Sequence, residues 1–388
     1  MFERVVETMR YTYRLRPGAS AVRVLETEWH RCRFIWNEAV HQQRTGGKPT
    51  LAKLGKLLTD ARRRMVWLRD GSQVAQQQML RSYTTALNQS FAVKGRGRPK
   101  VKRRKDSLPS LEYTRNGFSL ADGRLRLPKG IVIPVVWSRD LPSTPTSVRV
   151  YQDSLGHWYA SFVVRSPIEP LPQRSTGLGV DWGVSVTATT TNPDFDLPYG
   201  GNRKRCAAEL ARAQRKMARR RRPAGHTPSN GYSRARREAA RLQKKAARQN
   251  SHAARVWANS VVREHQLIAI EGFKPKFLAQ SSLAGKAADA AIGAAKRELL
   301  TRAKRAGRQV VIVEPAYTTM TCSSCFARAK RRLGLDERTF RCDSCGYIAG
   351  RDRNAAKVIL AVAERGHTSV DDVRHVWHSS SGVVVCAV

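Results

Sequence analysis

The chain has 388 residues, 41% of them hydrophobic, which is enough for two or three domains with packed cores. It carries 71 Lys and Arg against 30 Asp and Glu, so its net charge is +41 and its isoelectric point is about 11.1. A compact fold with this charge repels itself unless a polyanion screens it, which predicts a nucleic-acid partner. An anionic membrane is the alternative, but the most basic segments carry mostly Ala on their apolar sides and few aromatic anchors.

The N-terminal segment and the cysteine content predict a cytoplasmic location. Residues 1–20 carry charges throughout and have no apolar core of signal-peptide length. No run in the chain approaches the roughly 18 apolar residues of a membrane span, so we expect no membrane partner. Seven cysteines, an odd number, disfavour a secreted disulfide framework.

The first part of the chain alternates between strand-like and helix-like patterns. Residues 1–20 contain an alternating run that predicts the first strand of a small β-barrel. In residues 21–93, apolar side chains recur every three or four positions, which predicts a helical unit. Residues 94–166 hold a basic segment and four short strand-like runs, at 125–127, 131–136, 147–151 and 158–164. We therefore expect a barrel with the helical unit as an insertion.

Two segments concentrate the positive charge. Residues 94–105 contain eight basic side chains and no acid, and residues 201–250 contain 17 Lys and Arg against two Glu. A solvated helix face is the alternative for such a run, but charge of almost one sign makes an unpartnered helix pair unfavourable. The candidate nucleic-acid contacts are Lys94, Arg96, Arg98, Lys100, Lys102, Arg103, Arg104, Arg203, Arg215, Arg219, Arg220, Arg237, Lys244 and Lys245.

After a Pro-rich linker at 167–172, the pattern changes to buried-type strands and helices. Residues 173–320 predict an α/β domain that contains the basic helical pair 201–250 and strands at 177–182, 184–191, 267–271 and 310–314. A Cys-rich insert follows at 321–347, and a last helix spans 348–365. Residues 366–388 are polar and without a clear period, so they are a candidate disordered tail.

The Cys-rich insert predicts a metal site. Two CxxC pairs, Cys322 with Cys325 and Cys342 with Cys345, are separated by 16 residues. Each pair forms a tight knuckle, and two knuckles supply four soft thiolates in a tetrahedron, which suits one structural zinc ion. A disulfide pair or a chance pattern is the alternative. Gly346 fits the turn after the second knuckle, whereas Phe326 after the first is less expected.

Three acids stand out by position. Asp181 lies inside an apolar strand, Glu271 ends a strand, and Asp352 begins the last helix. Taken singly, Asp352 could be a helix N-cap and Glu271 a solvated strand end, but an unpaired charge such as Asp181 amid apolar residues costs several kcal/mol. Glu314 also ends a strand and is a fourth candidate, for which the neighbouring Pro315 favours a structural role.

Together, the three acids make a chemically coherent set. Two strands and a helix start can bring the carboxylates of Asp181, Glu271 and Asp352 together, and clustered carboxylates persist when cations neutralise them. Magnesium prefers an all-oxygen site. Two such ions about 4 Å apart can activate a water and stabilise the leaving 3′ oxygen of a phosphodiester. These residues are therefore our candidate catalytic site, in which the acids hold the metal.

The order GVDWG, IAIEGF, VEPAYTTMTCSSC, CDSCG and DRNAA resembles the TnpB transposon-associated nucleases and, equally, the smallest type V CRISPR effectors. The resemblance covers residues 20–360, and its specific motifs follow Gly177. It implies a multidomain α/β protein with an RNase H-like (RuvC) nuclease domain, an inserted zinc ribbon and the N-terminal barrel. Asp181, Glu271 and Asp352 match the family's acidic motifs. Trp182 and Phe326 depart from its usual residues.

The resemblance also implies partners and a reaction. These are a guide RNA, double-stranded target DNA that is cleaved, and a short flanking motif that the protein reads. Such a protein would be prokaryotic and would associate with the nucleoid when bound to DNA. Two alternatives remain open from the residues alone: a catalytically silent RNA-guided DNA-binding protein, and an unguided transposase or nuclease. The sequence does not separate a transposon context from a CRISPR context.

Overall fold

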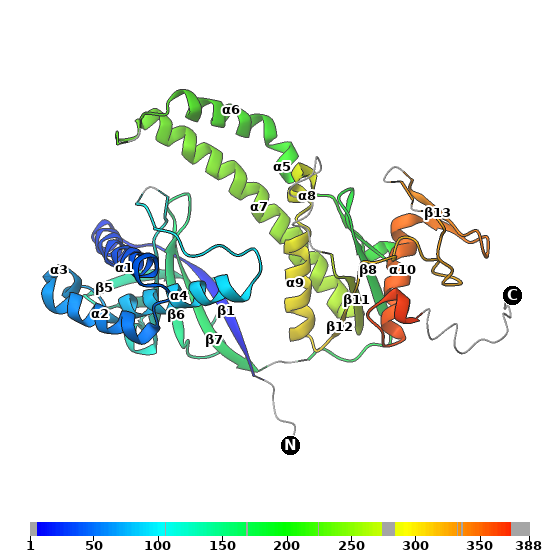
Figure 1. Cartoon of the computed structure of the whole chain (residues 1–388), viewed down its shortest axis with the longest axis horizontal. Coiled ribbons are helices and arrows are strands. Elements are labelled where there is room, and N and C mark those ends of the chain that lie inside the picture. Colours follow the sequence, from blue (N-terminus) through cyan, green and yellow to red (C-terminus); the bar gives the residue numbers. More distant parts are fainter. Residues whose placement is uncertain are drawn as a thin grey trace, which may run out of the picture. The chain divides into compact units, whose positions relative to one another are not determined.

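The computed structural model describes residues 6–104, 106–167, 170–223, 225–273, 284–331, 333–334 and 337–373 (Figure 1). The chain divides into two compact units, Met1–Pro167 and Ile168–Val388, and each is described by itself. In the described part of the chain, no helix combines the length and the apolar character that crossing a bilayer requires.

The first unit is built on an antiparallel sheet of seven strands in the order β2-β6-β7-β1-β5-β4-β3. The strands are β1 (Val6–Leu15), β2 (Ser110–Thr114), β3 (Ser119–Ala121), β4 (Arg124–Leu127), β5 (Ile131–Val136), β6 (Ser147–Gln152) and β7 (Trp158–Pro167). β1 is central because it pairs with β7 along its whole length and with β5 at its end. The first strand thus shares a sheet with strands that follow the helices. Closure of this sheet into a barrel stays a prediction.

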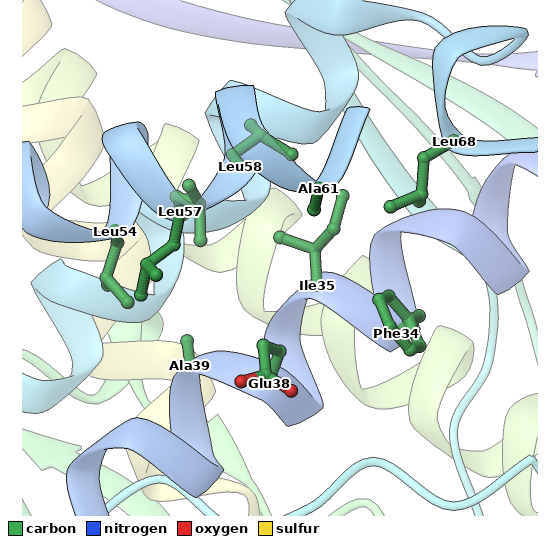
Figure 2. A pocket seen from close by; sticks show the side chains of 10 residues that line it. Phe34, Ile35, Glu38, Ala39, Leu54, Leu57, Leu58, Ala61 and Leu68 are labelled. Atoms are coloured by element: carbon green, nitrogen blue, oxygen red, sulfur yellow. The ribbon is translucent and has the colours of Figure 1, made fainter. Parts of the chain in front are cut away.

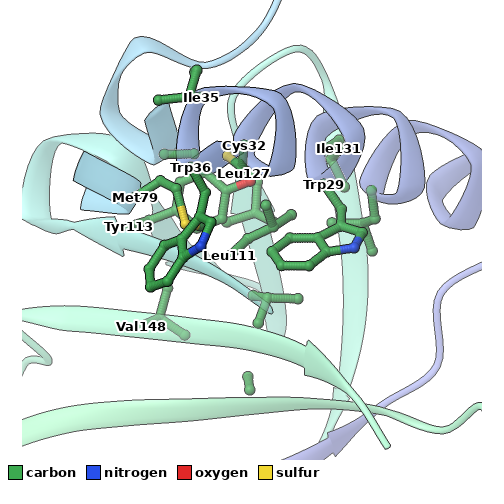
Figure 3. Close-up of a cluster of buried hydrophobic side chains, with 14 of the residues drawn as sticks. Trp29, Cys32, Ile35, Trp36, Met79, Leu111, Tyr113, Leu127, Ile131 and Val148 are labelled. Atoms are coloured by element: carbon green, nitrogen blue, oxygen red, sulfur yellow. The ribbon is translucent and has the colours of Figure 1, made fainter. Parts of the chain in front are cut away.

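Four helices lie between β1 and β2 in the chain: α1 (Ala19–Gly46), α2 (Leu51–Arg64), α3 (Val66–Arg69) and α4 (Gln73–Ala92). Trp29, Cys32 and Trp36 of α1 are buried in one core with Leu111 and Tyr113 of β2 (Figure 3). The aromatic residues at helical spacing are therefore core residues. A short 3-10 turn, Arg115–Gly117, follows β2.

A small apolar pocket of about 30 Å³ lies between α1 and α2, where Ile35, Leu54 and Leu58 are among the lining side chains (Figure 2). Its lining is almost wholly apolar, with Glu38 at the side. A cavity of this size has room for about one water molecule and is far smaller than a ligand site of roughly 300 Å³. We therefore regard it as a packing gap.

The second unit contains a mixed sheet of five strands in the order β10-β9-β8-β11-β12. The strands are β8 (Gly177–Trp182), β9 (Val186–Thr190), β10 (Leu197–Pro198), β11 (Leu267–Glu271) and β12 (Gln309–Val313), with a 3-10 turn at Pro193–Phe195. β8, β11 and β12 are parallel to one another, whereas β9 and β10 run antiparallel to their neighbours.

Alternate side chains of this sheet enter two different cores. Ile268 and Ile270 of β11 pack with α7 (Asn230–Glu264) and α9 (Ile292–Arg305), whereas Ala269 packs with α10 (Arg351–Glu364). Strand residues alternate in direction, so helices cover both faces of the sheet. Gly179 of β8 is required on the α10 side, because a Cβ there would lie 2.0 Å from the carbonyl oxygen of Ala356.

The basic segment 201–250 folds into α5 (Asn202–Arg205), α6 (Ala207–Arg219) and the first part of α7. α6 and α7 lie side by side (Figure 1), and their contact buries small side chains such as Ala213, Ala235 and Ala239. Apolar residues recur at helical spacing over 288–303, which predicts one helix. In the structure Ala291 is left-handed (φ 54°) and separates α8 (Ala284–Ala290) from α9.

The ribbon contributes β13 (Thr339–Arg341) and β14 (Ile348–Gly350), and β14 leads directly into α10. The segment after α10 differs from the expected disordered tail. Val370 and Val373 are buried in the α10 core, and the N–H of Glu314 donates to the carbonyl of Thr368 over 2.7 Å. The two apolar side chains explain this order for residues 366–373, while residues 374–388 lie outside the described part.

Asp289 joins the basic helices to α8. Its carboxylate accepts hydrogen bonds from the N–H groups of Arg203 (2.7 Å) and Lys204 (3.0 Å) and from the Tyr199 hydroxyl (2.8 Å). These donors lower the pKa of Asp289 although burial alone would raise it. The ionised form is therefore the one that this junction stabilises.

We predict that Asp289→Asn lowers the melting temperature at pH 7. A carboxyl whose pKa is depressed by folding stabilises the protein above its unfolded pKa of about 3.9, and this contribution is lost as the pH falls through the folded pKa. The difference from wild type should therefore shrink on acidification to about pH 3. Thermal unfolding at several pH values tests this, with the exposed Asp194→Asn as control. A lowering of the melting temperature that is the same at every pH would contradict this prediction.

Candidate active site and zinc ribbon

Asp181 and Glu271 lie at matching positions on neighbouring parallel strands. Val180 of β8 pairs with Ile270 of β11, so the next residue on each strand is an acid. The two acids alternate with residues of the α7 and α9 core and so face α10. Both side chains are largely buried, at 6% and 7% exposure, which is unusual for carboxylates.

Asp352 enters from the first turn of α10, the helix that packs against β8 through Gly179. Its carboxylate keeps 30% exposure and lies 3.4 Å from the Nε of Arg351 and 3.6 Å from Arg338. The structure therefore brings all three predicted acids to the α10 side of the sheet. Two arginines lie beside the most exposed of them.

The electrostatics identify the three acids as one group. Burial is the largest cause that raises the pKa of Asp181 well above its ordinary value, followed by the negative charges of Glu271 and Asp352. Burial also raises the pKa of Glu271 to about 7, against the opposing effects of the Thr318 hydroxyl and of Lys296. Mutual destabilisation of ionised carboxylates is relieved by a cation, and an all-oxygen donor set fits Mg²⁺.

Glu271 is fixed by three donors. The Trp182 indole N–H (3.2 Å) and the Lys296 ammonium (3.1 Å) bind its backbone carbonyl, and the Thr318 hydroxyl lies 3.4 Å from its carboxylate. Trp182 also contacts Trp257 of α7 edge-on, with ring centres 5.9 Å apart. The aromatic residue that departs from the family pattern thus ties β8 to β11 beside the acids.

Glu314, the fourth candidate acid, takes a different position. It is exposed just beyond β12, whereas Asp181 and Glu271 are buried. The segment after it contributes Thr318, which is fully buried next to Glu271. Sequence reasoning missed Thr318, because a single Thr in an irregular segment carries no periodic signal.

The four predicted cysteines converge. Their Sγ atoms all lie within 4.8 Å of one another, with 3.7 Å between Cys322 and Cys345 and 3.6 Å between Cys325 and Cys342. A tetrahedral zinc ion with Zn–S bonds of about 2.3 Å requires S···S separations of about 3.8 Å, so the four cysteines fit zinc. Among the described His, Cys, Asp and Glu side chains, this is the group whose ligand atoms already converge so closely.

The two knuckles have equivalent turns. Phe326 and Gly346 follow the second cysteine of each knuckle, and both have left-handed backbones, with φ of 58° and 72°. This conformation costs a non-glycine residue about 1–2 kcal/mol. The Phe326 ring is 4% exposed in the α10 core, and the Arg365 guanidinium lies 4.4 Å from its centre. Burial of the ring offsets the backbone cost, which explains a phenylalanine where glycine is expected.

The zinc ribbon is joined to the helix that carries Asp352. Asn354 of α10 is fully buried, where its side chain donates to the carbonyl of Thr321 (2.7 Å) and accepts from the N–H of Ser323 (2.9 Å). Arg351 donates to the carbonyl of Gly334 over 2.7 Å. The first knuckle and the first turn of α10 therefore form one hydrogen-bonded body.

The candidate nucleic-acid residues divide by exposure. Most side chains of the two basic segments are exposed, whereas Lys102 lies 4.1 Å from the centre of the Trp36 ring and burial lowers its pKa. Asn37 also binds both backbone groups of Lys102, at 2.8 and 3.2 Å. Lys102 therefore anchors the basic segment to α1. The exposed candidates are Lys94, Arg96, Arg98, Lys100, Arg103, Arg104, Arg203, Arg215, Arg219, Arg220, Arg237 and Lys245, and Lys244 is half-buried.

Two family models match parts of the chain between residues 160 and 359. Residues 160–280 match OrfB_IS605, described as "Probable transposase", and residues 294–359 match "Cas12f1-like, TNB domain". The first covers β8, β11 and the basic helices between them. The second covers the ribbon and most of α10.

Full-length relatives are also similar. A "Putative RNA-guided DNA endonuclease" of Streptomyces pristinaespiralis is 30% identical over 322 residues, which cover 81% of this chain and 78% of that protein. "Putative RNA-guided DNA endonuclease InsQ" of Escherichia coli (strain K12) is 28% identical over 377 residues, covering 90% and 91%.

A chain from the "Cryo-EM structure of the Cas12f1-sgRNA-target DNA complex" has a similar fold, with a TM-score of 0.54 at 13% identity over 91% of this chain and 98% of that chain. The multidomain α/β architecture expected from the sequence is thus confirmed. This chain belongs to the TnpB-like family of the relatives described above, as its motifs indicated.

We predict that the purified chain contains one zinc ion and that Cys345→Ser releases it. The backbone N–H of Tyr347 lowers the pKa of the Cys345 thiol to about 7, so this cysteine is readily available as a thiolate ligand. Elemental analysis and the melting temperature are the measurements. Cys206→Ser, outside the cluster, is the matched control and should retain zinc. Full zinc content in Cys345→Ser would contradict the assignment.

We predict that Trp182→Phe lowers the melting temperature by about 2–4 °C. The substitution keeps an aromatic ring against Trp257 but removes the donor to the buried Glu271 carbonyl, a loss of about 1 kcal/mol. Thermal unfolding measures the effect, and Trp137→Phe, which removes an indole donor at the exposed Gly123 carbonyl, is the comparison. An effect no larger than that of Trp137→Phe would show that the Trp182 hydrogen bond is dispensable.

Proposed function

We propose that this chain is an RNA-guided DNA endonuclease that hydrolyses phosphodiester bonds of target DNA at a magnesium-dependent, RuvC-like carboxylate site. The similarity to two relatives described as putative RNA-guided DNA endonucleases supports RNA guidance and DNA cleavage. The observation that carries the proposal is the convergence of Asp181, Glu271 and Asp352 from two strands and a helix onto one side of one sheet.

The sheet order supports an RNase H-like domain. Three successive antiparallel strands, β8 to β10, followed by two strands parallel to β8, is an arrangement typical of such domains. The acids lie on β8, on β11 and on the helix that packs against both. Fold alone does not establish function, so the proposal depends on the carboxylates.

Each side chain of the site has a distinct role in this proposal. Asp181, Glu271 and Asp352 would hold two Mg²⁺ ions through oxygen ligands. Bound there, the ions supply an activated water and stabilise the leaving 3′ oxygen. Arg338 and Arg351 lie beside Asp352 and place positive charge where a DNA phosphate approaches. Thr318 and Trp182 hold Glu271 in place.

The exposed basic residues are the proposed contacts to guide RNA and target DNA. A guide-bound protein covers many phosphates without reading their sequence, because base pairing with the guide selects the target. In the first unit the exposed arginines and lysines of 94–104 would make such contacts, and in the second unit those of α6 and α7 would do so. The first unit is proposed to read the short flanking motif.

We predict that Glu271→Gln and Asp181→Ala retain guide RNA and bind matched DNA but cut it at least about 100-fold more slowly. Each substitution removes a proposed metal ligand worth several kcal/mol of charge stabilisation. Glu314→Gln, at an exposed strand end, is the matched control and should cut normally. Single-turnover cleavage with titrated Mg²⁺, with filter binding in parallel, makes the comparison.

Three outcomes would contradict the proposal. Normal cleavage by Asp181→Ala would show that the reaction does not depend on these carboxylates. An RNA-bound wild type that binds matched DNA and leaves it intact at every Mg²⁺ concentration would be a silent DNA-binding protein. Cleavage that survives RNase treatment would indicate an unguided nuclease.

A further inference from the structure

A bidentate ion pair joins the first turn of α10 to the turn that follows β9. The Arg353 guanidinium donates from Nη1 and Nη2 to the two carboxylate oxygens of Asp196, over 2.9 and 2.8 Å. Asp196 also accepts from the N–H of Thr190 over 2.7 Å, and Arg353 donates to the Thr190 carbonyl. The three residues form a closed network at the end of β9.

This network connects two of the candidate metal ligands by a short path. Arg353 directly follows Asp352 in α10. Thr190 pairs with Val180 across the β8–β9 ladder, and Val180 directly precedes Asp181. The path from Asp352 to Asp181 therefore has two steps. Arg353, next to Asp352, binds Thr190, and Thr190 pairs with Val180, next to Asp181.

The contact between α10 and β8 needs such a connection. At Gly179 the strand presents no side chain to the helix, and the helix backbone lies where a Cβ would be. A surface without a side chain offers no ridge that resists rotation or sliding of the helix. A two-bond Arg–carboxylate pair fixes both distance and direction, since its two hydrogen bonds are parallel and planar.

Asn354 restrains the same helical turn through a different contact. It binds the first zinc knuckle, whereas Arg353 binds the sheet. Three consecutive residues of α10 therefore make three different contacts. Asp352 faces the other two acids, Arg353 binds the turn after β9, and Asn354 binds the ribbon. The Arg353 and Asp196 side chains are each 25% exposed, so solvent screens only part of the attraction between them.

We propose that Arg353 and Asp196 are positioning residues that set the separation of Asp352 from Asp181 and thereby the affinity of the site for divalent cations. This inference rests on the metal site of the proposed function. Neither side chain is a candidate metal ligand, so the pair acts through the placement of α10. Loss of the pair should weaken metal binding while leaving nucleic-acid binding intact.

The test measures Mn²⁺ binding by electron paramagnetic resonance on the full-length chain with its zinc in place. Asp196→Asn removes the charge of the acceptor, and Arg353→Lys keeps the charge but loses the planar fork. We expect each to raise the Mn²⁺ dissociation constant and the Mg²⁺ concentration for half-maximal cleavage by about tenfold, which corresponds to about 1.4 kcal/mol. Saturating Mg²⁺ should largely restore the cleavage rate.

The control is Asp194→Asn, which removes the same charge from the same turn but has an exposed side chain. It should bind Mn²⁺ like wild type. In the double variant Asp196→Asn with Arg353→Lys, the loss should not exceed that of the larger single variant, because the two residues act as one unit. Melting temperatures and DNA binding close to those of the wild type would show that the variants are folded. A loss of metal affinity would then reflect positioning.

Two results would separate failure of this inference from failure of the proposed function. Unchanged Mn²⁺ affinity in both Asp196→Asn and Arg353→Lys, with binding abolished in Asp181→Ala, would overturn the positioning role alone. Unchanged Mn²⁺ binding in Asp181→Ala would remove the metal site and the inference with it. Additive losses in the double variant would also contradict a paired role.

Discussion

The close approach of α10 to β8 is the contact on which the candidate site depends. Because Gly179 has no side chain, the helix backbone can occupy the space beside the strand. Asp352 at the start of this helix then reaches the face on which Asp181 and Glu271 already lie at matching positions of parallel strands. A bulkier residue at Gly179 would force the helix away from the strand and separate the acids. The geometry of the site therefore begins with backbone packing, and the charged side chains follow from it.

Burial gives these acids their chemical character. An apolar setting raises the pKa of Asp181 and Glu271, and their mutual repulsion adds to this cost at Asp181. Two of the donors around Glu271 bind its backbone carbonyl, and among the described residues its carboxylate accepts one long hydrogen bond, from the Thr318 hydroxyl. Burying these ionised carboxylates is unfavourable in free energy without a cation and favourable with one, as the proposed magnesium site requires.

The zinc ribbon is bound to the helix that carries one of the candidate acids. A cysteine cluster that fits zinc stabilises a small insert, and the insert is bonded through Asn354 to the helix that carries Asp352. The segment after α10 closes the arrangement, since Asp371 pairs with Arg328 of the ribbon and Val370 enters the α10 core. The candidate zinc site is thus linked to the candidate active site through ordinary hydrogen bonds and packing.

The sequence by itself determined the strands that carry Asp181 and Glu271, the four cysteines of the cluster and the family, because apolar runs, CxxC spacing and acidic motifs are local patterns. Only the tertiary structure decided which residues act together. Lys102 packs against tryptophans, Glu314 is exposed just beyond β12, and Arg353 meets Asp196 across more than 150 positions of the chain. These pairings depend on strand order and on one glycine contact between a helix and a sheet. A periodic pattern encodes the face of an element but not the partner that this face meets.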